Sequence, residues 1–202
     1  MTGRPCLLCG SEGYDAVAGP ADRPYERCRA CGLLSLAVPF EPSGAPAIRP
    51  LVVKGRLSLH RRLLEKLGSA SAPGRLLDVG SGSGEFLELA SAAGWEVEGV
   101  EPYAPSVDKA RRKGLTVHAG DLAAARLPEG SFDVVTYWEV IDYVEEPVAE
   151  LREVLRVLRP GGVVWLRTRN APFHMACWNL MITILITSIY SFTHQKFTIF
   201  FQ

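Results

Sequence analysis

The sequence predicts an α/β protein with a doubly wound parallel sheet and a small, separate N-terminal module. Three observations carry this prediction. From Arg75 onward, short apolar segments alternate with amphipathic ones, which is the pattern of βαβ units. The first apolar segment runs directly into three alternating glycines and then an amphipathic segment. Four of the five cysteines form two pairs within residues 1–31.

The composition is that of one folded domain of ordinary size with a small appendage. Of the 202 residues, 48% are hydrophobic and 22% are charged, and 22 basic and 22 acidic side chains give a net charge of zero. This composition excludes the disordered and fibrous classes. A chain without net charge has no overall field to attract nucleic acid or an anionic membrane, so neither is an expected partner.

The paired cysteines have the spacing of a metal site. Two residues separate the cysteines of each pair, and a glycine follows each pair. Four thiolates around one Zn²⁺ are the ligand set of a structural zinc site. Two disulfides are the alternative, but the first residues do not resemble a secretory signal, and we expect a cytoplasmic protein. Residues 1–36 are therefore predicted to form a zinc ribbon with a short strand at 25–27, and its predicted ligands are Cys6, Cys9, Cys28 and Cys31.

A linker and a helix follow the predicted ribbon. Residues 37–50 contain four prolines and are predicted to form a semi-rigid linker. Residues 51–67 have leucines toward one side and predict a helix that ends at Gly68. This helix begins a domain that we expect to extend over residues 51–172.

The predicted sheet of that domain has five strands with helices between them. Glycine or proline follows each predicted helix and marks its end. The segment 122–130 is too short to predict a helix. The predicted strands are Arg75–Val79, Trp95–Val100, Leu115–His118, Phe132–Tyr137 and Gly162–Thr168, and the predicted helices are Glu85–Ala93, Pro105–Lys113 and Pro147–Leu158.

The glycine-rich turn after the first strand is the most informative motif. Bare backbone at a helix N-terminus allows close approach of a ligand. A dinucleotide fingerprint, G-x-G-x-x-G, would need its third glycine where Glu85 stands. Gly80, Gly82 and Gly84, with Asp78 two residues before the first, instead resemble motif I of class I S-adenosylmethionine-dependent methyltransferases. This resemblance implies a Rossmann-like fold of the methyltransferase type.

Later positions resemble the same family in the same order. Glu101 ends the second strand, where a carboxylate accepts two hydrogen bonds from ribose hydroxyls and disfavours a 2′-phosphate. Gly120-Asp121-Leu122 follows the third strand, Phe132–Trp138 resembles the fourth strand, and 158–162 resembles the turn into the fifth. The cysteine pairs and proline-rich linker also resemble those of methyltransferases with a zinc ribbon, which act on small molecules.

The resemblance implies a role in cofactor binding for each matching residue. The three glycines would admit the methionine and ribose portions of S-adenosylmethionine, and Asp78 would orient the loop and the amino group. Glu101 would hold the ribose. Asp121 would accept a hydrogen bond from the adenine amino group, with Leu122 beside the ring. Trp138 would lie near the sulfonium, where an aromatic face favours a cation; a place in the core is the alternative.

The expected activity is methyl transfer to a small-molecule acceptor. A general base is needed only for an alcohol, phenol or ammonium acceptor. Related sequences commonly have histidine where this chain has Tyr143, so Glu139 is the candidate catalytic residue, with a solvated surface acid as the alternative. A second expectation for the whole chain is an inactive, cofactor-binding or partner-binding remnant of a truncated methyltransferase.

Residues 173–202 differ from the rest in composition. They contain no Gly, Pro, Arg, Asp or Glu, although the chain has 19 glycines and 14 prolines. One interpretation is a membrane-spanning helix within 173–195, although polar residues interrupt its apolar sequence. Another is a pair of strands at 182–189, replacing the antiparallel hairpin that completes the family's seven-stranded sheet. We favour a third, a foreign segment encoded by AT-rich codons, which would leave five of the seven strands.

Overall fold

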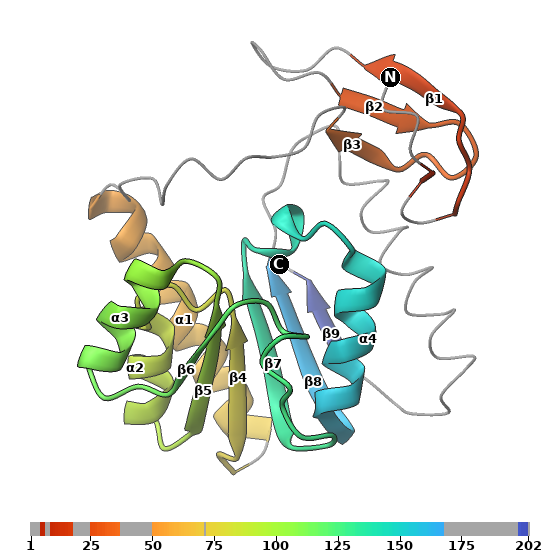
Figure 1. Cartoon of the computed structure of the whole chain (residues 1–202). Helices are drawn as coiled ribbons and strands as arrows, with labels where there is room; N and C mark the ends of the chain where they lie inside the picture. The colour runs from red at the N-terminus through yellow and green to blue at the C-terminus, as the bar shows by residue number, and fades with distance from the viewer. Residues whose placement is uncertain are drawn as a thin grey trace. The chain divides into compact units, whose positions relative to one another are not determined.

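The computed structural model describes residues 5–6, 9–17, 25–36, 50–70, 72–167 and 198–201. They divide into two units, one around a three-stranded sheet and one around a six-stranded sheet (Figure 1). The predicted linker 37–50 and tail 173–202 lie outside the described residues, except for Pro50 and residues 198–201. The domain boundaries therefore stay predictions.

The N-terminal sheet is an antiparallel meander of β1 (Tyr14–Val17), β2 (Tyr25–Cys28) and β3 (Leu34–Leu36). Strand β2 contains the predicted strand 25–27. Its last residue, Cys28, lies opposite Tyr14 of β1, and both side chains are buried. Together with Cys6 they form a buried cluster of three side chains among the described residues of this unit.

The larger sheet has the strand order β6-β5-β4-β7-β8-β9, and every neighbouring pair is parallel. From β4 the chain builds outward to β5 and β6, and it then returns to add β7 on the other side of β4. The predicted doubly wound parallel sheet is therefore confirmed. Its strands are β4 (Arg75–Val79), β5 (Glu96–Glu101), β6 (Val117–Ala119), β7 (Phe132–Trp138), β8 (Leu158–Arg167) and β9 (Thr198–Phe201).

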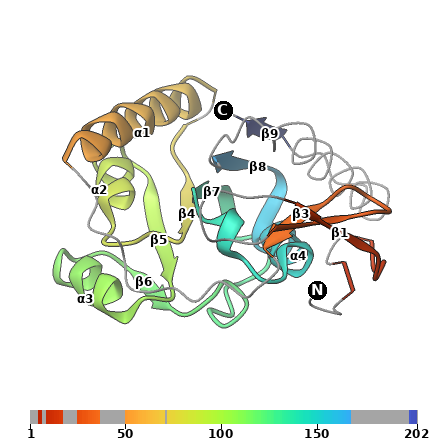
Figure 2. The same cartoon turned by 90° about the horizontal axis from the view of Figure 1, so that it is seen from above.

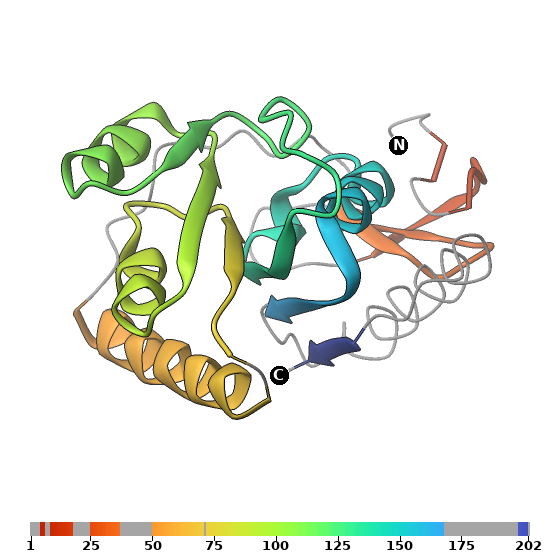
Figure 3. The ribbon, with the colours of Figure 1, turned by 90° about the horizontal axis from the view of Figure 1, so that it is seen from below.

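Helices cover both faces of this sheet. One face carries α1 (Pro50–Ala70), α2 (Glu85–Ala92) and α3 (Ala104–Arg112), and the other carries α4 (Pro147–Val157), as Figures 2 and 3 show. A short 3-10 helix, η1 (Ile141–Tyr143), follows β7. Among the residues that the structure describes, no helix has the length and apolar content to cross a bilayer.

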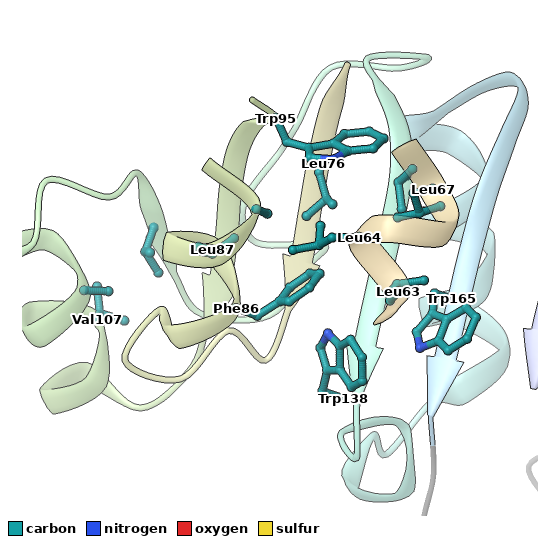
Figure 4. Packing of buried hydrophobic residues seen from close by; sticks show 14 residues of the cluster. Leu63, Leu64, Leu67, Leu76, Phe86, Leu87, Trp95, Val107, Trp138 and Trp165 are labelled. Carbon is teal, nitrogen blue, oxygen red and sulfur yellow. The ribbon is translucent and has the colours of Figure 1, made fainter. Parts of the chain in front are cut away.

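Helix α1 continues past Gly68, so the predicted end at that residue is wrong. A glycine inside a helix costs only about 1 kcal/mol relative to alanine. The burial of Leu63, Leu64 and Leu67 on the preceding turns stabilises the helix by more than this. These leucines pack over a cluster that includes Phe86, Trp138 and Trp165 (Figure 4).

The tail contributes a strand that the sequence analysis did not predict. Residues 198–201 form β9 and pair with β8, with Thr198 opposite Val163. The sequence Thr-Ile-Phe-Phe is rich in residues that favour strands. The strands considered at 182–189 lie outside the described residues. Strand β8 also begins earlier than predicted, because Leu158 already pairs with Phe132 before a register shift in β7.

Helix α4 is joined to β7 by a partly buried hydrogen bond. The Tyr137 hydroxyl donates to Glu150 Oε1 at 2.8 Å. Burial raises the pKa of the Glu150 carboxyl above its ordinary value of 4.5 and outweighs the hydrogen bond from Tyr137, which lowers this pKa. The folded protein thus favours the neutral Glu150 carboxyl. Its contribution to the free energy of unfolding is fully present below the unfolded-state pKa of this carboxyl. The contribution is lost as the pH rises through the folded-state pKa.

A Glu150→Gln variant tests this shift. Glutamine keeps an acceptor for Tyr137 and stays neutral, so the stability of the variant relative to the wild type should increase as the pH rises from the ordinary carboxyl pKa of 4.5 through the raised folded-state pKa of Glu150. Urea unfolding of both proteins at several pH values measures the difference. A difference in free energy of unfolding that does not change with pH would contradict the raised pKa.

Candidate cofactor and metal sites

The glycine-rich loop lies at the point where the sheet changes its winding direction. Strand β4 ends at Val79, and the backbone N–H groups of Gly80 and Ser81 both donate to the Val100 carbonyl of β5, at 2.8 and 3.1 Å. The loop therefore bends over the carboxyl end of β5 before α2 begins. Ligands of open α/β sheets bind at this kind of position.

The three glycines of the loop have different surroundings. A Cβ at Gly80 would overlap Val140, and a Cβ at Gly84 would overlap Leu115. At Gly82 the nearest atom to such a Cβ is Glu85 Oε2, 3.9 Å away, so the space there is open. Of the three, Gly82 alone leaves room for a ligand, whereas Gly80 and Gly84 permit close packing within the protein.

Glu101 connects the loop to the end of β5. Its Oε2 accepts the Gly82 N–H and its Oε1 accepts the Tyr103 N–H, both at 2.8 Å. Only 8% of the residue is exposed. Each carboxylate oxygen has two lone pairs, so each keeps one further acceptor position.

Asp78 acts inside the sheet. It is 2% exposed, and its Oδ1 accepts a hydrogen bond of 2.6 Å from the Thr136 hydroxyl on β7. The register of the two parallel strands places these residues opposite each other. Its expected role in orienting the loop, which begins two residues later, and the amino group of the cofactor stays a prediction.

Asp121 lies at the same edge of the sheet as Glu101. The Gly120 N–H donates to the Glu101 carbonyl, which joins the ends of β5 and β6. Asp121 is exposed, and its Oδ1 accepts the Ala124 N–H at 2.7 Å, which leaves Oδ2 for a ligand. Leu122 is fully buried and offers no surface for the expected contact with an adenine ring.

The structure places Trp138 in the hydrophobic core, which is the alternative considered for it. The residue is 7% exposed, and its ring centroid lies 4.2 Å from that of His60 and 5.2 Å from that of Phe86. Figure 4 shows its ring beside Phe86 and Trp165. The ring therefore packs against α1 and α2.

Glu139, directly after β7, forms an ion pair. Its Oε1 lies 2.7 Å from Arg167 Nη1 at the end of β8. The sequence analysis missed Arg167, as it missed Thr136 and Val140. Opposite charges at the ends of two strands expected to be neighbours were a usable signal for the ion pair, whereas no sequence pattern indicated Val140.

The four predicted zinc ligands come together in the N-terminal unit. Their Sγ atoms all lie within 4.8 Å of one another, and the Cys6–Cys31 and Cys9–Cys28 pairs are 3.6 Å apart. A tetrahedron with Zn–S bonds of about 2.3 Å has edges of about 3.8 Å. The separations fit a single zinc ion and are too long for disulfide bonds among the four.

The backbone of each cysteine pair forms the same tight turn. The Gly10 N–H donates to the Cys6 carbonyl at 2.8 Å, and the Gly32 N–H donates to the Cys28 carbonyl at 2.9 Å. Burial opposes ionisation of Cys28, but backbone N–H groups of Cys31 and Ala30 outweigh it and lower the pKa of Cys28 to about 6. Burial raises the pKa of Cys31 above its ordinary value, so the four thiols do not share the shift of Cys28.

Comparison with known proteins agrees with this geometry. A family model described as a methyltransferase domain matches residues 54–197. The chain belongs to the class I S-adenosylmethionine-dependent methyltransferase family. The match covers the loop, the strand ends and much of the atypical tail of this methyltransferase domain.

Individual relatives share part of the domain. The ubiquinone biosynthesis O-methyltransferase of Xanthomonas oryzae is 36% identical over 108 residues, 49% of this chain and 44% of that protein. The chain thus spans less than half of the length of this relative. Among solved structures, CalS10, an amino pentose methyltransferase from Micromonospora echinaspora with bound S-adenosylmethionine, is 27% identical. It has a TM-score of 0.54, and the match covers 66% of this chain and 61% of CalS10.

Proposed function

We propose that the methyltransferase domain binds S-adenosylmethionine at the loop after β4 and transfers its methyl group to a small-molecule acceptor. One observation carries this proposal. The buried Glu101 carboxylate accepts the Gly82 N–H of the loop and keeps further lone pairs, and a Cβ at Gly82 would meet only Glu85 Oε2, at 3.9 Å. A diol such as ribose, with two neighbouring hydroxyl donors, matches such a carboxylate.

The other residues of the site suit the remaining parts of the cofactor. The N-terminus of α2 and the bare backbone of Gly82 accept a ligand at close range. Asp121 Oδ2 is available to an adenine amino group. S-adenosylmethionine supplies an electrophilic methyl group on its sulfonium, so the protein's task is alignment and exclusion of water.

The acceptor is inferred from the relatives and from charge. The O-methyltransferases of ubiquinone biosynthesis and the amino pentose methyltransferase, as their names state, act in the chemistry of small molecules. The zero net charge of this chain gives no electrostatic attraction for nucleic acid. A small, uncharged or weakly charged acceptor fits both observations.

Calorimetric titration with S-adenosylmethionine tests cofactor binding. Glu101→Ala should weaken it about tenfold to a hundredfold, because hydrogen bonds to a charged group contribute about 1.5–3 kcal/mol. Glu96→Ala is the matched control, since Glu96 lies on the same strand with its side chain 71% exposed. NAD should not bind either protein. A wild type that does not bind S-adenosylmethionine would refute the proposal.

Methyl transfer is tested separately with labelled S-adenosylmethionine and panels of phenols, amino sugars and other small molecules. Transfer of label to one of them by the wild type, and not by Glu101→Ala, supports the enzyme. Cofactor binding without transfer to any acceptor in a whole metabolite extract would instead favour the second expectation, a binding remnant.

We also propose that Cys6, Cys9, Cys28 and Cys31 hold one structural Zn²⁺. The sulfur separations support this ligand set. Four thiolates fill a tetrahedral shell, so this ion would stabilise the N-terminal unit and take no part in methyl transfer.

A further inference from the structure

Glu139 has a backbone conformation that is unusual for its residue type. Its φ is +61°, and among the described residues Arg126 is the only other non-glycine residue with a positive φ. A side chain in this region costs roughly 1–2 kcal/mol, so surrounding contacts must hold it. Such conformations concentrate at functional sites, and Glu139 lies at the carboxyl edge of the sheet beside the loop.

Arg167 supplies the contacts that hold Glu139. The Arg167 guanidinium reaches Glu139 Oε1 at 2.7 Å, and the Arg167 carbonyl accepts the Glu139 N–H, also at 2.7 Å. Both side chains are about three-quarters buried. The parallel register, in which Trp138 lies opposite Arg167, places Glu139 within reach of both groups. Two contacts thus fix the turn that leaves β7.

That turn determines where Val140 lies. Val140 is the next residue, and its side chain fills the space where Gly80 has no Cβ. Gly80 in turn begins the loop whose Gly82 N–H is held by Glu101. A continuous series of packed or bonded residues therefore runs from Arg167, through Glu139 and Val140, to the cofactor loop.

We propose that Glu139 is a positioning residue, which Arg167 holds in a left-handed conformation so that Val140 keeps the cofactor loop in its binding geometry. This inference rests on the proposed binding of S-adenosylmethionine. It also assigns the Glu139 carboxylate a role other than that of general base, since Arg167 uses the carboxylate to fix the backbone.

Cofactor affinity measures this role. If loss of the ion pair leaves about a tenth of the molecules with a competent loop, the apparent Kd for S-adenosylmethionine rises about tenfold. We expect this increase for Glu139→Ala. Glu139→Gln keeps an oxygen acceptor of the same length, so its Kd should stay within about threefold of the wild type. Arg126→Ala is the control, because it alters the other positive-φ residue.

Calorimetry and thermal unfolding of the full chain are measured for each variant. A purely structural role for Glu139 would lower the unfolding temperature of Glu139→Ala and leave the Kd of the folded protein within twofold of the wild type, which would overturn the proposal. If Glu139→Ala does not fold, Arg167→Met removes the same ion pair without changing the strained residue and is judged by the same Kd criterion. If the wild type does not bind S-adenosylmethionine, the proposed function is overturned instead. If the wild type binds it and the Kd values of the variants equal that of the wild type, only the role of Glu139 is overturned.

Discussion

Replacing Cys28 with serine is expected to abolish stoichiometric zinc binding and to unfold the N-terminal sheet. Cys28 is buried, ends β2 and supplies one of the four clustered sulfurs. The described residues of this unit contain a buried cluster of three side chains, and structural zinc contributes on the order of 10–16 kcal/mol to folding in comparable modules. Metal analysis of the purified protein, together with amide NMR signals from β1 and β2, measures both effects.

Cys177→Ser provides the control, because Cys177 belongs to neither cysteine pair. This variant should keep one zinc per chain. A strong chelator should reproduce the Cys28→Ser spectrum in the wild type, and added Zn²⁺ should reverse it. One zinc per chain in the Cys28→Ser protein, with unchanged signals from β1 and β2, would show that the four sulfurs do not form the metal site.

Gly80→Ala is expected to reduce mainly the stability of the protein, whereas Gly82→Ala is expected to reduce mainly cofactor binding. Gly80→Ala places a methyl group against Val140 in a backbone with φ of +72°, and we expect a loss of about 2–5 kcal/mol in the free energy of unfolding. Gly82→Ala meets open space at a φ of +56°, so its stability cost should be only about 1–2 kcal/mol. Its methyl group would instead occupy the space proposed for the cofactor and abolish measurable binding.

Urea unfolding and calorimetry separate the two effects. Shortening Val140 removes the overlap, so the Gly80→Ala/Val140→Ala double variant should recover part of the stability that Gly80→Ala loses. No such recovery would mean that the backbone conformation, and not the contact with Val140, makes glycine necessary at position 80. If Gly82→Ala binds S-adenosylmethionine as tightly as the wild type does, the cofactor does not bind at this loop.

The sequence predicted those parts of the site that depend on local order along the chain. A strand, a glycine-rich turn and a helix are contiguous, and Glu101 ends the strand that follows them, so their proximity could be anticipated. The four cysteines were found for the same reason, because the spacing within each pair reflects the turn itself. Predicting the loop and Glu101 required only the order of the strands and the general position of ligands in α/β sheets.

The remaining features depend on side chains that meet across the fold. The reason for glycine at position 80 is Val140, sixty residues later in sequence, and at position 84 it is Leu115. Placement of Trp138 in the core follows from the packing of α1 and α2, with which its ring shares the cluster. Periodicity identifies a buried face, but it does not identify which residues touch within it.

The bond between Asp78 and Thr136 has a consequence for the order of folding. It joins residues 58 positions apart, whereas β4 and β5 are adjacent in the chain. Because pairing of distant segments carries a larger loop-closure cost, we expect β4, α2 and β5 to associate before β7 docks. Val140 reaches Gly80 only after that docking. The loop should therefore acquire its final shape late, and pulse-labelled hydrogen exchange should show the Gly82 amide protected after the amides that join β4 to β5.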